Sequence, residues 1–185
     1  ATGGELVQGP HCTFQSVSID TRTLQRNAVF FCLKGPNFDG HRFAQTAHER
    51  GAAIIVVERS AVSALEGLET LGTVIAVDDT ERALGQLASR WRDLHDVTVV
   101  GLTGSSGKTT TKELVAAVLR CAGPTLSTEG NLNNHLGVPL TLLRLTEAHR
   151  YAVIEMGMNA FGEIEYLASL AKPTIGIITT VGRAH

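Results

Sequence analysis

One stretch of the sequence decides the fold: Gly101-Leu-Thr-Gly-Ser-Ser-Gly-Lys-Thr-Thr-Thr-Lys112. It follows a short apolar run, residues 97–100, and it leads into residues 113–120, which have the spacing of a helix. A buried strand that passes through a glycine-rich turn into a helix surrounds an anion with backbone N–H groups and the positive end of the helix dipole. The stretch therefore predicts a phosphate-binding loop between a strand and a helix.

Each polar or small residue of this loop has a chemical reason to be there. Gly104 and Gly107 remove side chains where the backbone must approach phosphate oxygens closely. Lys108 supplies a cation for the β- and γ-phosphates, and the hydroxyl of Thr109 can ligate Mg²⁺. The loop departs from the common form G-x-x-x-x-G-K-[ST], since Leu102 stands where the first glycine would be. The motif present is the shorter T-G-x-x-G-K-T-T, which begins at Thr103. The alternative, a Gly/Ser turn with a surface lysine, leaves the agreement of strand, glycines and helix unexplained.

The totals exclude several classes of protein. The 185 residues carry a net charge of −2 and are 43% hydrophobic, which suits one large or two small globular domains. Scattered lysines and arginines argue against a nucleic-acid partner, and the longest apolar runs are too short to cross a bilayer. Three isolated cysteines and the lack of a secretory segment at the start predict reduced, buried thiols in a cytoplasmic protein.

Strand-like and helix-like segments alternate in two successive units, which predicts an α/β fold. The expected strands are residues 28–33, 52–57, 73–77, 97–100, 151–154 and 175–181, and the expected helices include 41–50, 61–68, a helix around 84–94, the helix after the loop, and 163–171. We place a boundary near residue 96, with a first domain at 1–79, a connecting helix at 80–96 and a second domain at 97–185. Continuous apolar runs joined by helices predict parallel strands, and ligands bind beyond the carboxyl ends of such strands.

Two further side chains are expected at that edge of the second domain. Glu155 comes directly after an apolar strand, where a carboxylate is costly to bury unless it is paired or bound to a metal. Beside a phosphate loop it is best explained as a ligand of Mg²⁺, although local capping or pairing is an alternative. His185 could complete a metal site or orient a phosphate, and from spacing alone a surface histidine explains it equally well.

Several segments together resemble the Mur ligase family. They are Thr103-Gly-Ser-Ser-Gly-Lys-Thr-Thr110, Gly130-Asn-Leu-Asn-Asn134 with Gly137-Val-Pro139, and Glu155-Met-Gly-Met-Asn-Ala-Phe-Gly-Glu163. In the first domain, Asp20-Thr-Arg22, Phe30-Phe-Cys-Leu-Lys-Gly35 and Phe38-Asp-Gly-His41 resemble the uridine-nucleotide domain of the family. The segment from Glu155 to Glu163 is most similar to the branch that adds D-alanyl-D-alanine.

The resemblance implies a small N-terminal α/β uridine-nucleotide domain followed by a P-loop-type parallel-sheet ATPase domain that is incomplete at its C-terminus. It implies that ATP phosphorylates the terminal carboxylate of a UDP-linked muramoyl tripeptide, and that the amine of D-alanyl-D-alanine then attacks the acyl phosphate. The cofactors implied are ATP and Mg²⁺. The implied partners are these small molecules, with no nucleic acid, no membrane insertion and a monomeric chain.

The resemblance also assigns roles to individual residues. Lys108, Glu155 and His185 match catalytic positions, and Thr109, Glu155 and His185 match metal positions. ATP contacts are assigned to Gly104, Ser105, Ser106, Gly107, Lys108, Thr109, Thr110 and Asn134. Uridine-nucleotide contacts are assigned to Thr21, Arg22, Lys34, Gly35, Asp39, Gly40 and His41.

The chain also departs from the family pattern. Family members are well over twice this length, and the rest of the ATPase sheet, a modified metal-bridging lysine and a third domain have no counterpart here. We therefore expect the 185-residue chain to bind its ligands without ligating them. Two alternatives remain at this point: a folylpolyglutamate- or cyanophycin-type ligase, and a module that binds nucleotide or UDP-sugar without catalysis.

Overall fold

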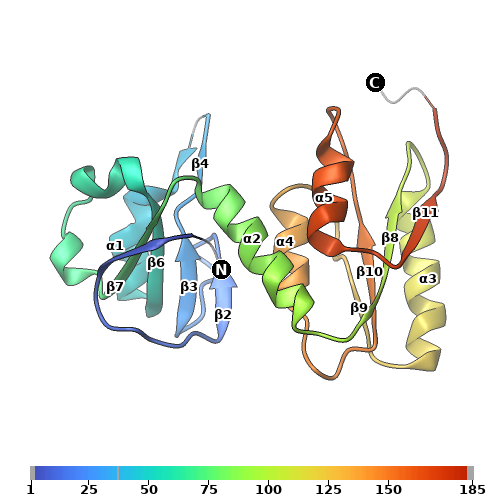
Figure 1. Ribbon diagram of the computed structural model, residues 1–185, viewed down its shortest axis with the longest axis horizontal. Coiled ribbons are helices and arrows are strands. Elements are labelled where there is room, and N and C mark those ends of the chain that lie inside the picture. The colour runs from blue at the N-terminus through green and yellow to red at the C-terminus, as the bar shows by residue number, and fades with distance from the viewer. Residues whose placement is uncertain (1–2, 37, 183–185) are drawn as a thin grey trace. The chain divides into compact units, whose positions relative to one another are not determined.

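The structure, a computed structural model, describes residues 3–36 and 38–182. The chain divides into two compact units, 1–84 and 85–185, and both are α/β as expected (Figure 1). The division falls inside helix α2 (Thr80–Asp93), earlier than the expected boundary near residue 96. It falls there because Ala88 and Trp91 of α2 pack in the core of the second unit.

The first unit contains a five-stranded sheet with the order β1-β7-β6-β3-β2. The strands are β1 (Glu5–Gln8), β2 (Ser16–Ser18), β3 (Ala28–Phe31), β6 (Ala52–Glu58) and β7 (Thr73–Val77). Strands β2, β3, β6 and β7 are parallel, whereas β1 runs antiparallel to β7 with Leu6 opposite Ile75. Strand β1 was not predicted, because most of its side chains are exposed and give it no apolar pattern.

The helices of the first unit are shorter than the sequence predicts. The expected helix at 41–50 is a 3₁₀ turn, η1 (Gly40–Phe43), followed by α1 (Ala44–Glu49). The expected helix at 61–68 is replaced by two 3₁₀ turns, η2 (Arg59–Ala64) and η3 (Leu68–Thr70), separated by Gly67 at φ +65°. Strands β4 (Lys34–Gly35) and β5 (Phe38–Asp39) form a small antiparallel pair. The core lies between α1 and the sheet, where Phe30, Ala47 and Ile55 are buried.

The second unit contains a four-stranded sheet with the order β11-β8-β10-β9, and every pair in it is parallel. The strands are β8 (Thr98–Thr103), β9 (Thr125–Ser127), β10 (Tyr151–Glu155) and β11 (Ile175–Ile178). Val153 pairs with Val100 on one side and Ser127 on the other, so the neighbouring strands end at the same edge. This confirms the expected parallel sheet, to which the structure adds β9.

Helices cover both faces of this sheet (Figure 1). Helix α3 (Lys108–Ala122) packs on one face, and α4 (Gly137–Leu142) and α5 (Glu163–Ala171) pack on the other. The apolar face expected for α3 is partly wrong: Leu114 and Val118 are 64% and 70% exposed. Ala116 and the charged residue Lys112 are instead the fully buried positions of that helix.

Two smaller expectations concern the burial of the cysteines and the absence of a membrane-spanning helix. Of the three cysteines only Cys32 is buried, because it follows the fully buried strand β3, whereas Cys12 and Cys121 are exposed. Burial raises the pKa of the Cys32 thiol to about 12. Within residues 3–36 and 38–182, every helix falls short of the length and apolar character that a membrane span needs.

Candidate functional site

The predicted phosphate loop lies between the end of β8 and the first residue of α3. Gly104 and Gly107 have φ values of +143° and +79°, a region that side chains with a Cβ rarely adopt. The half-buried side chain of Lys108 folds over the loop, and its Nζ donates a hydrogen bond of 2.7 Å to the carbonyl of Gly104. The first helical hydrogen bond runs from the N–H of Thr111 to the carbonyl of Gly107, 3.0 Å. The N–H groups from Lys108 to Thr110 therefore have no acceptor within the helix and suit an anion.

The segment that follows β11 holds this loop in place. The N–H groups of Ser105 and Ser106 donate to the carbonyl and the hydroxyl of Thr180, at 2.9 and 3.2 Å. The hydroxyls of Thr179 and Thr180 donate back to the carbonyl of Ser106, at 2.6 and 2.9 Å. A loop fixed from both sides needs less reorganisation when it receives a ligand.

Glu155 ends β10 at the same edge of the sheet, as expected, and its side chain is buried, with 1% exposed. Its Oε1 accepts a hydrogen bond of 2.8 Å from Asn133 Nδ2 and lies 3.5 Å from the hydroxyl oxygen of Thr109. Its Oε2 is buried and has no hydrogen-bond partner in the part of the chain that the structure describes. A buried carboxylate oxygen without a partner is costly, so this atom suits contact with a cation.

The oxygens at this edge fit Mg²⁺. This ion is usually held by one or two carboxylates together with waters and substrate phosphates. Adjacent ligands of an octahedral Mg²⁺ lie about 3 Å apart, since each is at about 2.1 Å. The oxygens of Thr109 and Glu155 are close to that spacing at 3.5 Å. Among the described residues there is no group of three or more His, Cys, Asp or Glu side chains that could hold a metal ion. His185 lies outside the described residues, and its metal role stays a prediction.

The amide-rich loop before α4 contributes a residue that the sequence analysis missed. Asn134, assigned to ATP, uses its Oδ1 to accept hydrogen bonds from the N–H groups of Leu136 and Gly137, at 3.2 and 2.8 Å. The preceding residue, Asn133, is the one whose amide reaches Glu155. The composition of the loop signals an amide at this place, but only the backbone path decides which asparagine points to the carboxylate.

In the first unit, Thr21 and Arg22 line a cavity of about 530 Å³, a volume within the range of small-molecule sites. Aromatic side chains form part of its wall, and the rings of Phe38 and Phe43 are stacked with centroids 5.6 Å apart. Arg22 Nη2 donates to Asp20 Oδ2 at 2.6 Å. The side chain and the N–H of Arg22 together hold the pKa of the Asp20 carboxyl at about 2, below its usual 3.8.

The other uridine candidates do not share this cavity. Asp39 and His41 line a second cavity of about 390 Å³, and the exposed residues Lys34 and Gly35 lie on β4. His41 Nδ1 lies 2.7 Å from Asp39 Oδ1, and His41 Nε2 accepts from the N–H of Glu58 at 2.9 Å. Both ring nitrogens are therefore occupied, which favours a structural role for this imidazole.

Buried Gly40 also belongs to the framework of the first unit. Its N–H donates to the carbonyl of Leu33 at 2.7 Å. A Cβ at this position would lie 2.6 Å from that same oxygen. A glycine is therefore required here by the close approach of two backbone segments.

Comparison with known proteins identifies relatives of both units. Residues 13–92 match the family described as Mur ligase family, catalytic domain, and residues 102–185 match the Mur ligase middle domain. The UDP-N-acetylmuramoyl-tripeptide–D-alanyl-D-alanine ligase of Escherichia coli is 46% identical over 182 residues, covering 98% of this chain and 38% of the ligase.

Solved structures agree with the sequence matches. A crystal structure of MurF from Acinetobacter baumannii matches all of this chain and 40% of its own, with a TM-score of 0.90 and 39% identity. MurF from Thermotoga maritima, crystallised in complex with ADP, matches 92% of this chain and 38% of its own, with a TM-score of 0.80 and 33% identity. The chain thus spans about two fifths of the length of these relatives. Because the two family matches follow each other along most of the sequence, the chain belongs to the Mur ligase family.

Proposed function

We propose that this chain supplies the nucleotide-binding part of an ATP-dependent ligase of peptidoglycan precursor synthesis. The reaction is the addition of D-alanyl-D-alanine to UDP-N-acetylmuramoyl-tripeptide. The proposal is supported by relatives that carry this name and by the geometry at the carboxyl edge of the second sheet. Cytoplasmic location and a monomeric state belong to the same proposal.

One observation carries the chemistry: the Oε2 of Glu155, buried and without a partner among the described residues, lies on a carboxylate beside the phosphate loop. A generic phosphate site would not need a buried anion next to the anion that it binds. A site for Mg²⁺ and ATP does, because the cation satisfies the carboxylate and the phosphates together. Thr109 and Glu155 would hold the ion, which when bound neutralises phosphate charge during transfer.

The remaining residues bind and orient. The N–H groups at the start of α3, which have no acceptor within the helix, and the ammonium of Lys108 would hold the β- and γ-phosphates of ATP. The terminal phosphoryl group passes to the carboxylate of the tripeptide, which forms an acyl phosphate and releases ADP. The amine of the dipeptide then attacks the carbonyl carbon, and the bond to phosphate breaks. Losing one charged donor to the transferring group costs roughly 3 kcal/mol of barrier, about a hundredfold in rate.

The first unit would hold the UDP part of the substrate. The cavity beside Thr21 and Arg22 combines aromatic side chains in its wall with a guanidinium whose side chain is 85% exposed. A planar base stacks on aromatic rings, and arginine binds phosphate oxygens in a bidentate way. This division predicts that the two ligands bind independently.

Calorimetry on the 185-residue chain tests the proposal. We expect Mg²⁺–ATP to bind to the unaltered chain and to lose its binding in Lys108→Ala, while UDP-muramoyl tripeptide binds to both. Arg22→Ala is the matched variant and should weaken only the uridine ligand. Absence of binding by either ligand to the unaltered chain would refute the proposal. Nucleotide binding without uridine binding would favour a folylpolyglutamate-type ligase. Amide-bond formation by this chain would contradict the expectation that it binds without ligating.

A further inference from the structure

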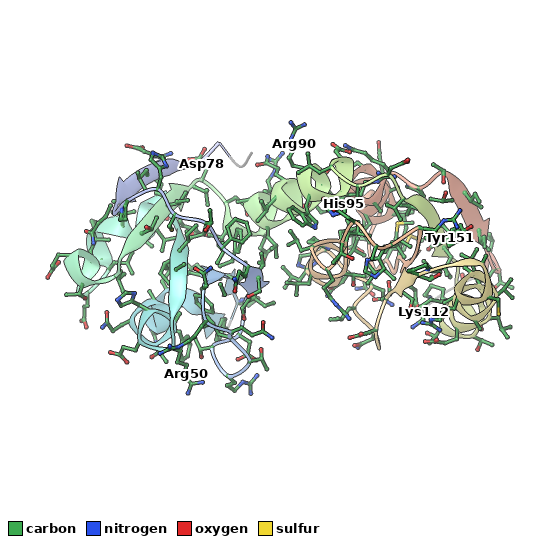
Figure 2. The ribbon with its side chains drawn as sticks, turned by 90° about the horizontal axis from the view of Figure 1, so that it is seen from below. Arg50, Asp78, Arg90, His95, Lys112 and Tyr151 are labelled. Atoms are coloured by element: carbon green, nitrogen blue, oxygen red, sulfur yellow. The ribbon has the colours of Figure 1, made fainter. Side chains whose placement is uncertain are left out.

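A buried lysine in the second unit has no role in the chemistry described so far. The side chain of Lys112, on α3, is only 1% exposed and lies on the side of the helix that faces the strands (Figure 2). Its Nζ donates to the carbonyl of Thr128 at 2.7 Å and forms an ion pair with Glu113 at 2.9 Å. Burying an ammonium group is costly unless its partners compensate for the lost hydration. A residue of this kind in the interior calls for a specific reason.

The reason lies in the way that β9 leaves the sheet. The pairing of β9 with β10 extends to Ser127 and Val153, and the N–H of Thr128 still donates to the carbonyl of Val153 at 3.0 Å. In a regular parallel ladder, the N–H of Glu155 would donate next to the carbonyl of Thr128. It donates instead to the Thr128 hydroxyl at 3.0 Å, and Lys112 takes the carbonyl. The lysine therefore replaces a sheet hydrogen bond at the point where the chain turns away.

The chain that turns away comes back to the same glutamate. The loop passes through Gly130, at φ +54°, to Asn133, which donates from Nδ2 to Glu155 Oε1 at 2.8 Å. The carbonyl of Asn133 accepts from the N–H of Gly157 at 2.8 Å. Glu155 is thus held at its backbone by Thr128 and at its carboxylate by Asn133. The loop that carries both contacts begins at Thr128, whose carbonyl accepts the hydrogen bond from Lys112.

We propose that Lys112 is a positioning residue for the metal site. By holding the carbonyl of Thr128, it fixes the backbone of Glu155 and the path of the loop, so that Oε1 is satisfied by Asn133 and Oε2 is left for the cation. The inference rests on the proposed function for the identity of that cation. The contacts themselves are independent of it.

The test measures metal affinity rather than activity. Mn²⁺ is the probe, because it takes the same kinds of oxygen ligand as Mg²⁺ and can be followed by electron paramagnetic resonance. We expect Lys112→Met to weaken Mn²⁺ binding in the presence of ADP by about 10- to 100-fold, the usual cost of removing a group that orients a metal ligand. The affinity for ADP without metal should not change. Glu113→Gln removes the other partner of Lys112 and should leave Mn²⁺ binding intact.

A second pair of variants keeps the test valid if Lys112→Met does not fold. Thr128→Val removes the hydroxyl that accepts from Glu155 and should weaken Mn²⁺ binding, whereas Thr128→Ser should preserve it. In Thr128→Val, hydrogen exchange at the N–H of Glu155 should become faster. Equal Mn²⁺ affinity in the unaltered chain and in both Lys112→Met and Thr128→Val would overturn this inference alone. Absence of Mn²⁺ binding to the unaltered chain with ADP would overturn the proposed metal site, and the role of Lys112 with it.

Discussion

Replacing Glu155 by glutamine removes the charge of this side chain while keeping its size. The carboxylate is buried and, although its Oε1 accepts from Asn133, its Oε2 has no partner among the described residues, so without a metal it is an anion with one oxygen unsatisfied. We expect Glu155→Gln to raise the free energy of unfolding of the second unit by about 1–2 kcal/mol in metal-free buffer, because an unpaired buried charge costs more than an unpaired amide. The same substitution should remove the response to metal.

Urea unfolding followed by tryptophan fluorescence measures this effect. Trp91 is the only tryptophan of the sequence, and it packs against the core of the second unit. Its indole N–H donates to the carbonyl of Leu145 at 3.0 Å, so its signal reports this unit. Mg²⁺ with ADP at a hundred times its dissociation constant should stabilise the unaltered chain by about 2.7 kcal/mol. In Glu155→Gln, Mg²⁺ should add nothing to the stabilisation that ADP gives without metal.

The matched control is an exposed carboxylate. Glu129 is 65% exposed and forms an ion pair of 2.6 Å with Arg144. Glu129→Gln should change stability by less than about 1 kcal/mol and should keep the effect of magnesium. The reasoning would be refuted if Glu155→Gln lowered the stability of the metal-free chain and left the stabilisation by Mg²⁺ and ADP unchanged.

Three further predictions use other parts of the structure. Gly104 has a φ of +143°, and a Cβ at this position would lie 2.1 Å from a threonine hydroxyl oxygen. Gly104→Ala should therefore weaken ADP binding at least tenfold, roughly 1.4 kcal/mol, in calorimetry. The control Gly176→Ala, whose Cβ would have nothing within 4 Å, should leave ADP binding unchanged. Iodoacetamide should modify two of the three thiols of the native chain, as counted by mass spectrometry, because burial raises the pKa of Cys32 to about 12. The pKa of Asp20 is about 2 when folded, below the usual 3.8, so its pairing with Arg22 stabilises the chain above about pH 4 and is lost as the pH falls towards 2. Arg22→Ala should return this pKa towards 3.8 in an NMR titration, and equal acid stability of both chains would contradict the assignment.

The phosphate loop could be predicted from the sequence alone because every part of it is local. A strand, two glycines, a lysine, a threonine and a helix start follow one another along the chain, and each constrains the backbone of its neighbours. Glu155 was predictable for a related reason. It ends an apolar strand, and strands of a parallel sheet end at a common edge, so its place beside the loop follows from alternation alone.

Other features depended on contacts between distant segments. Sequence composition could not separate Asn133 from Asn134, because which amide reaches Glu155 depends on the path of the loop. Leu114 on α3 has an apolar side chain at an exposed position, while charged Lys112 is buried. The helical pattern therefore gave the wrong inner face for part of this helix.

The sequence by itself determined that this chain has two α/β units, that a phosphate loop follows the first strand of the second unit, and that a carboxylate lies near this loop. These properties depend on hydrophobic periodicity and turn chemistry, which act over a few residues. Only the tertiary structure decided that Lys112 replaces a hydrogen bond of the sheet and that both ring nitrogens of His41 are occupied. The physical reason is that a buried polar group is stable only with a partner, and that partner comes from whichever segment the strand order and register bring beside it.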